Sequence, residues 1–177
     1  MSIRLSGRAA AVLAVVGTLA VLAATLGPSL PRIVAYLDQT GVRFQGFDFV
    51  LWGTVSPVIQ AHVLAALAAF GLGLVLLLNR KGSSFHKAMG WTWVGLMAMT
   101  AGTSLFITGL NGDSYSLIHG LTAFTLVMLP LGVMAARRKD ITRHRRTMTG
   151  LFLGALLVAG VFTFVPGRLM WSLFFGA

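Results

Sequence analysis

Four histidines are the residues of this chain best suited to chemistry in an apolar environment: His62, His86, His119 and His144. A neutral imidazole is a common metal ligand and titrates near neutral pH. The spacing repeats, because 24 positions separate His62 from His86 and 25 separate His119 from His144. In both intervals an apolar run leads into a basic segment and then a histidine followed by a cation. The pattern predicts two copies of one hairpin.

Other kinds of reactive site are poorly represented in the sequence. There is no cysteine, which excludes disulfides, zinc–thiolate sites and cysteine-ligated iron–sulfur clusters. There is also no glutamate, and the four aspartates fall in expected loops. Neither a Ser–His–Asp arrangement nor an HExxH motif is evident, which argues against a hydrolase. The chemistry of this chain therefore centres on its histidines.

The elements that position the histidines are expected to be membrane helices. The chain of 177 residues is 56% hydrophobic and only 10% charged, with a mean hydropathy of +0.85, whereas soluble domains carry roughly 25% charged residues. Five apolar runs are close to the ~20 residues that a spanning helix needs. They are Ala9–Leu26, Val58–Leu78, Ala88–Leu110, Leu117–Ala136 and Thr147–Val165. The first exceeds the ~7–15 residues of a signal-peptide core, so we interpret it as a retained helix. The sequence predicts an all-α, polytopic membrane protein with five transmembrane helices.

The cations predict an orientation in the membrane. With a cytoplasmic N-terminus, eleven lysines and arginines fall on the inner side and three, Arg32, Arg43 and Arg168, on the outer side. The positive-inside rule therefore places the N-terminus inside and the C-terminus outside. The net charge of +10 then reports topology and not nucleic-acid binding. We expect a multi-pass protein of the bacterial cytoplasmic (inner) membrane.

The expected organisation is one membrane domain with three parts. Residues 1–57 hold the first helix and an irregular or interfacial outer loop from Gly27 to Pro57, rich in proline, glycine and aromatic residues. Residues 58–166 form a four-helix core that carries one histidine per helix. Residues 167–177 form an aromatic tail at the outer surface, where tryptophan and similar side chains are favoured.

Alternating helix directions sort the histidines into an outer pair and an inner pair. Two hairpins in the same orientation are related by an axis along the membrane normal, which sets His62 opposite His119 and His86 opposite His144. Facing imidazoles at one depth in a helix bundle are what bis-histidine haem ligation requires. We therefore expect one or two molecules of haem b, with these four histidines as the iron ligands.

The inner pair also invites a simpler interpretation. His86 and His144 are expected just outside the apolar runs, in basic loops, where a solvated histidine is ordinary, whereas the outer pair lies deeper. Nearby cations are candidates for binding haem propionates, namely Arg80, Lys87, Arg143 and Arg145. The same cations serve equally as positive-inside anchors.

This arrangement resembles the transmembrane di-haem cytochrome b superfamily, in which the second and fourth and the third and fifth helices pair through histidines. The sequence resembles still more an uncharacterised bacterial family of predicted membrane proteins. The similar stretches include "SSFHKAMGWTWVGLM", "SLIHGLTAF" and "AARRKDITRHRRTMTG" and extend over roughly residues 59–168. The resemblance implies a four-helix core with haem at His62/His119 and at His86/His144.

Two functions from different classes follow. The first is a b-type cytochrome that relays electrons across or within the membrane, to or from a carrier such as quinone; if it is an enzyme, it is an oxidoreductase subunit. The second is a haem-free accessory or assembly subunit of a larger membrane complex, docked through its aromatic segments. A transporter or channel is less favoured, because no acidic residue lies within an expected span.

Overall fold

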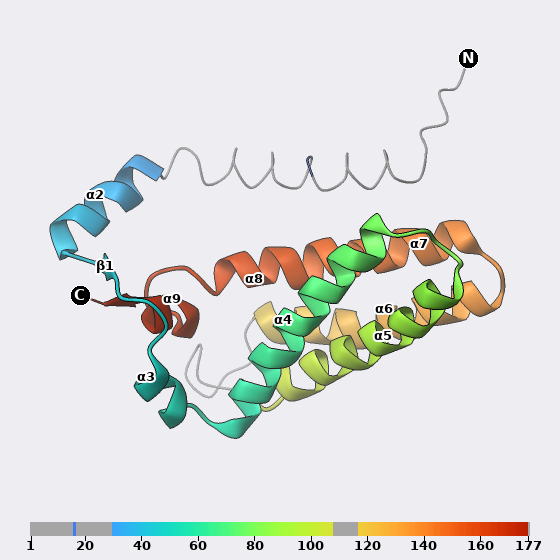
Figure 1. The fold of residues 1–177 in the computed structure, drawn as a ribbon, viewed down its shortest axis with the longest axis horizontal. Helices are drawn as coiled ribbons and strands as arrows, with labels where there is room; N and C mark the ends of the chain where they lie inside the picture. Colours follow the sequence, from blue (N-terminus) through green and yellow to red (C-terminus); the bar gives the residue numbers. More distant parts are fainter. Residues whose placement is uncertain (1–15, 17–29, 108–116, 177) are drawn as a thin grey trace, which may run out of the picture. The chain divides into compact units, whose positions relative to one another are not determined.

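The computed structural model describes residue 16 and residues 30–107 and 117–176, and this part of the chain is mostly helical (Figure 1). It divides into two compact units. The helical unit comprises Val55–Ala159 and carries all four histidines. The terminal unit combines the described residues up to Thr54 with those from Gly160 onward. Each unit is described by itself below.

The helical unit is built from consecutive helices that pack on their neighbours in the chain. They are α4 (Pro57–Leu78), α5 (Ser84–Ser104), α6 (Leu117–Arg137) and α7 (Ile141–Gly150). The last continues as a π-helix, η2 (Leu151–Val158), and then as α8 (Ala159–Phe162). Figure 1 shows α4 and α5 joined by a short turn, as are α6 and α7. α4 therefore packs on α5, and α6 on α7, while the interpretation of these pairs as two copies of one hairpin stays a prediction.

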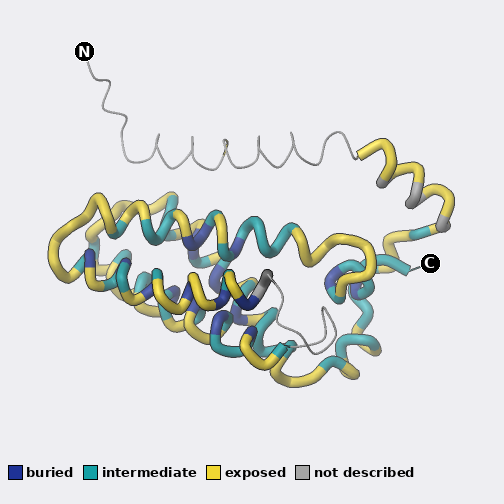
Figure 2. The backbone as a smooth tube through the Cα atoms, turned by 180° about the vertical axis from the view of Figure 1, so that it is seen from behind, coloured by how far each residue is buried: buried dark blue, intermediate teal, exposed yellow. Residues whose placement is uncertain are grey.

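Three described helices are long and apolar enough to cross a membrane: Pro57–Leu78, His119–Arg137 and Ile141–Phe162. Much of the surface of these helices is exposed (Figure 2). The exposed side chains include large apolar ones, such as Leu64 and Leu67, each 60% exposed. Such a surface is unfavourable in water and suits contact with lipid.

The expected spans differ from the observed helices in several ways. The first expected span, Ala9–Leu26, lies outside the described residues except for Val16, so the count of five stays a prediction. The third was expected at Ala88–Leu110, but α5 begins at Ser84 and ends at Ser104, and it is not among the three candidate spans. The fifth was expected at Thr147–Val165, but its helix runs from Ile141 to Phe162.

The core of the helical unit combines small residues with a few large ones. Ala69 of α4 is fully buried, and its carbonyl accepts a hydrogen bond of 2.9 Å from the indole Nε1–H of Trp93 on α5. Phe152 of η2 is 2% exposed and stacks on Phe70, with ring centroids 5.5 Å apart. The bond between Trp93 and Ala69 satisfies a buried indole and fixes α5 against α4.

The stretch expected as an irregular or interfacial loop, from Gly27 to Pro57, contains regular elements among its described residues, and its interfacial position stays a prediction. That stretch contains α2 (Leu30–Thr40), the short strand β1 (Arg43–Phe44) and α3 (Phe49–Thr54). The Asp48 carboxylate accepts a hydrogen bond of 2.8 Å from the Leu51 N–H, and so caps the start of α3. Prolines and glycines suggested irregular backbone, but they separate short elements here.

The expected tail pairs with this stretch. It forms α9 (Leu169–Phe174) and β3 (Phe175–Gly176), and β3 pairs antiparallel with β1, with Phe44 opposite Phe175. Phe47 packs on Trp52 and on Phe174, with ring centroids 5.7 and 5.6 Å apart. The two aromatic segments singled out from the sequence therefore form one cluster in the terminal unit.

Candidate functional site: the histidine cavity

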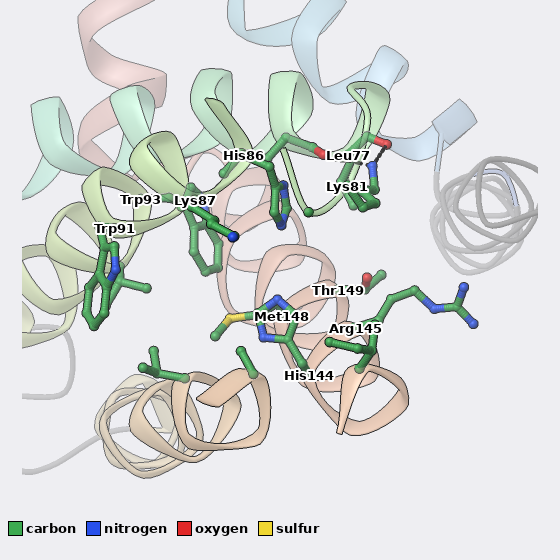
Figure 3. Close-up of a pocket in the computed structure, with 18 of the residues that line it drawn as sticks. Leu77, Lys81, His86, Lys87, Trp91, Trp93, His144, Arg145, Met148 and Thr149 are labelled. Carbon is green, nitrogen blue, oxygen red and sulfur yellow. Dashed lines mark hydrogen bonds between the residues drawn. The ribbon is translucent and has the colours of Figure 1, made fainter. Parts of the chain in front are cut away.

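A cavity of about 560 Å³ lies in the helical unit, between α4, α5, α6 and the α7–η2 helix (Figure 3). Its volume is within the roughly 300–1,000 Å³ that is usual for cofactor and ligand sites. Most of its walls are apolar, with side chains such as Leu76, Val94 and Val133. A cavity of this kind suits a largely apolar molecule.

His86 and His144 both line the cavity. Figure 3 shows the two imidazoles pointing toward each other from opposite walls, His86 from α5 and His144 from α7. The expectation that these histidines lie in loops is wrong, because both belong to the first turns of helices. A helical backbone holds each imidazole in a defined direction, which a solvated loop would not.

Capping residues explain why the helices begin early enough to include the histidines. The Ser83 hydroxyl accepts a hydrogen bond of 3.1 Å from the His86 N–H at the start of α5. The Asp140 carboxylate accepts one of 3.0 Å from the Arg143 N–H at the start of α7. Serine and aspartate are favoured caps because they satisfy N–H groups that lack a helical partner. The segments "SSFH" and "KDITRH" carried this signal in the sequence.

A tight corner between α6 and α7 sets the position of His144. The Asp140 N–H donates to the Ala135 carbonyl and the Lys139 N–H to the Ala136 carbonyl, at 2.9 and 3.0 Å. This is the Schellman pattern, which requires a left-handed residue, and Lys139 takes that place with φ of 61°. Asp140 therefore ends one helix and begins the next, so α7 starts directly beside α6.

The tautomer of His144 is fixed by α6. Its Nδ1 lies 2.9 Å from the carbonyl oxygen of Gly132. A carbonyl only accepts, so Nδ1 carries the proton and Nε2 keeps its lone pair. Metal-ligating histidines commonly use such a bond to orient the ring. A Cβ atom on Gly132 would come within 2.6 Å of the Met148 Cε, so glycine allows this close approach of the helices.

The surroundings of His86 favour the neutral form of its imidazole. Burial lowers the pKa of its imidazole, and repulsion from His144 and Lys81 lowers it further. Its Nδ1 is buried and has no hydrogen-bond partner among the described residues. A neutral imidazole has the lone pair that metal ligation needs. The site thus presents two imidazoles that suit ligation from opposite sides.

Four cations line the cavity: Lys81, Lys87, Arg137 and Arg145. Of the cations expected to bind a cofactor, Lys87 and Arg145 are among them, but Arg80 and Arg143 are not. Lys81 and Arg137 were missed, because their neighbours in space are not visible in the sequence. Lys81 donates to the carbonyls of Leu76, Leu77 and Asn79 at the end of α4. The Arg137 guanidinium lies 5.6 Å from the centroid of the Trp91 ring.

Two glycines that line the cavity, Gly73 and Gly90, differ in how closely other side chains approach them. At Gly73, an added Cβ atom would lie 2.5 Å from the Phe152 ring and 2.9 Å from Trp93 Nε1. At Gly90, one turn after His86, an added Cβ atom would meet nothing within 4 Å. The cavity lining is therefore tightly packed at Gly73 and leaves space at Gly90.

The structure places the outer histidines in a different setting. The His62 Nδ1 lies 2.9 Å from the Thr100 carbonyl oxygen and 3.2 Å from the Thr103 hydroxyl, both on α5. His119 is 8% exposed at the start of α6. Residues 108–116, which precede α6, lie outside the described part of the chain. The pairing of His62 with His119 therefore stays a prediction.

Comparison of the chain with protein-family models, with curated proteins and with solved structures gives no match. The family resemblance noted from the sequence therefore stays an expectation. Within the described ranges, no three His, Cys, Asp or Glu side chains gather as a metal site. Haem needs fewer protein ligands than a bare ion, because the porphyrin supplies four of the iron's ligands and two histidines complete the set.

Proposed function

We propose that this protein is a b-type cytochrome of the membrane, with a haem between His86 and His144. The observation that carries the proposal is that these two imidazoles face each other across an apolar cavity of about 560 Å³. The bond from His144 Nδ1 to the Gly132 carbonyl supports it, because it leaves Nε2 ready for ligation.

The haem supplies a one-electron couple when it is bound, and the chain supplies its setting. His86 and His144 would hold the iron, and the apolar walls would limit the access of water, which influences the potential. Within this proposal the protein relays electrons within or across the bacterial inner membrane, to or from a carrier such as quinone. His62 and His119 are the predicted ligands of a second haem.

Visible spectroscopy tests the proposal. Protein purified from haem-replete cells should show a low-spin b-type spectrum that sharpens on reduction with dithionite. His144→Ala and His86→Ala should each abolish the inner-site signal, and added imidazole should restore part of it if the fold is intact. A colourless wild-type protein that retains its helical circular dichroism would overturn the proposal.

The second candidate is a haem-free accessory subunit of a larger membrane complex. The terminal unit favours it, because Phe44, Phe49 and Val50 are 70%, 77% and 82% exposed there. If docking is their role, Phe44→Ser/Phe49→Ser should release the chain from a co-purifying complex. A cytochrome that acts alone should keep its spectrum and its size on gel filtration after the same change.

A further inference from the structure

The histidine cavity has a one-sided charge. Four of the side chains that line it are basic and none of the described lining residues is acidic. The nearest acid along the chain, Asp140, caps α7 and does not line the cavity. Cations grouped around an apolar cavity favour a ligand that combines an apolar body with acidic groups.

The four cations are not equivalent. Lys81 is engaged by three carbonyl oxygens at the end of α4, and Arg137 lies against the Trp91 ring. By contrast, the side chains of Lys87 and Arg145 make no hydrogen bond or ion pair with any described residue. Each follows one of the histidines directly, so the two come from opposite walls.

Figure 3 shows how these two side chains lie. Lys87 carries its ammonium group into the cavity beside Trp93. Arg145 extends past Thr149, and its guanidinium points away from the two imidazoles. Lys87 therefore lies within the cavity and Arg145 beside it, free to turn inward, and among the described residues neither has a partner that a ligand would have to displace.

We propose that Lys87 and Arg145 select the ligand of this cavity by its carboxylate groups, independently of iron ligation by the histidines. The inference rests on the proposed function, where the acid groups are the two propionates of the porphyrin. It assigns specificity to two of the four lining cations and excludes Arg80, which does not line the cavity. A porphyrin whose carboxylates are esterified should bind more weakly.

Metal-free protoporphyrin IX is a suitable probe, because it has the carboxylates of haem and no iron for the histidines. Its binding to the full-length chain in detergent is followed by quenching of tryptophan fluorescence, since Trp91 and Trp93 line the cavity. Its dimethyl ester is measured in the same micelles, so that partition into detergent is matched. Wild-type protein should prefer the free acid about tenfold, the scale of one or two partly solvated charge-assisted contacts.

Lys87→Gln/Arg145→Gln should remove that preference by weakening the free acid alone. Lys87→Arg/Arg145→Lys should keep it, and so should Arg80→Gln, a neutralisation outside the cavity. The inference is overturned if wild type binds the ester as tightly as the acid, or if the double glutamine variant keeps the preference. If wild-type protein binds haem normally but does not prefer protoporphyrin IX to its ester, this inference is wrong and the proposed function stands. Acid preference without a low-spin haem spectrum sinks the proposed function alone.

Discussion

At one end of the helical unit His86 and His144 face a shared cavity, and at the other end His62 lies against the Thr100 carbonyl and the Thr103 hydroxyl of α5. At the end that holds His62, side-chain hydrogen bonds join the helices. His62 bonds to the Thr100 carbonyl, and the hydroxyls of Ser104 and Thr122 lie 2.6 Å apart. At the cavity end, the helices are instead joined by their turns and by the bond from His144 Nδ1 to the Gly132 carbonyl oxygen. Among the described residues, His144 and His86 thus line a cavity, whereas His62 bonds to a neighbouring helix.

Depth in an apolar run does not by itself identify which histidines line a cavity. The outer pair lies deeper along the sequence, yet the cavity lies at the inner pair. Buried polar groups inside a membrane bundle also bridge helices, where each such bond contributes about 0.6 kcal/mol and up to ~1.7. A space lined by ligating and apolar groups is the stronger indicator.

The largest expected effect comes from filling the cavity. Gly90→Leu places a side chain where a Cβ atom meets nothing within 4 Å, beside His86. Overpacking costs of ~1–3 kcal/mol correspond to a loss of haem affinity of up to about a hundredfold. Haem titration followed at the Soret band measures it.

Gly102→Leu is the matched control for Gly90→Leu. It lies on the same helix, in its outer half, and is equally free of neighbours within 4 Å. Haem affinity should be unchanged. If both variants lose haem affinity equally, the site is not confined to the end of the helical unit that holds Gly90.

The second-largest expected effect is a loss of stability when Gly73, in the cavity lining, is replaced. Gly73→Leu brings new atoms against Phe152 and Trp93, which are buried and cannot move aside easily. We expect a loss of ~1–3 kcal/mol in the free energy of unfolding. Gly71→Leu, on the exposed side of α4, should cost much less. Denaturation in mixed detergent micelles compares them, and equal stabilities would contradict the close packing.

His62→Ala should act on stability and leave the inner spectrum intact. It removes the bond to the Thr100 carbonyl between α4 and α5, with an expected loss of about 1 kcal/mol. Thr122→Val should lower the free energy of unfolding by a similar amount, because it removes the hydrogen bond between the Thr122 and Ser104 hydroxyls. If His62→Ala abolishes all haem binding while the protein stays folded, the outer site is the principal one.

The smallest effect is a gain at the corner that positions His144. Lys139 adopts φ of 61°, which glycine tolerates without the steric cost that other residues bear. Lys139→Gly should raise the free energy of unfolding by about 0.5–1 kcal/mol. Arg138→Gly, one residue earlier, should not stabilise. A loss of stability in Lys139→Gly would argue against the left-handed corner.

Much of the helical unit could be predicted from the sequence, because apolar runs of spanning length fix helices almost regardless of tertiary context. The two hairpins and the place of each histidine near a helix start follow from this. The predicted helix starts were less accurate. An apolar run ends at its first polar residue, whereas the caps Ser83 and Asp140 allow the helices to begin within polar sequence. The roles of Lys81 and Arg137 depend on contacts between elements, which periodicity does not show.

The measurement that tests the central claim most directly is the haem content per chain of two paired variants. His86→Ala/His144→Ala removes the imidazoles that face the cavity, and His62→Ala/His119→Ala removes the outer ones. Both are purified from haem-replete cells, checked for helical content, and compared with wild type by quantitative haem extraction. We predict that the outer variant retains haem with a low-spin spectrum and that the inner variant loses the inner-site haem. Full haem content in the inner variant, with none in the outer variant, would contradict the account.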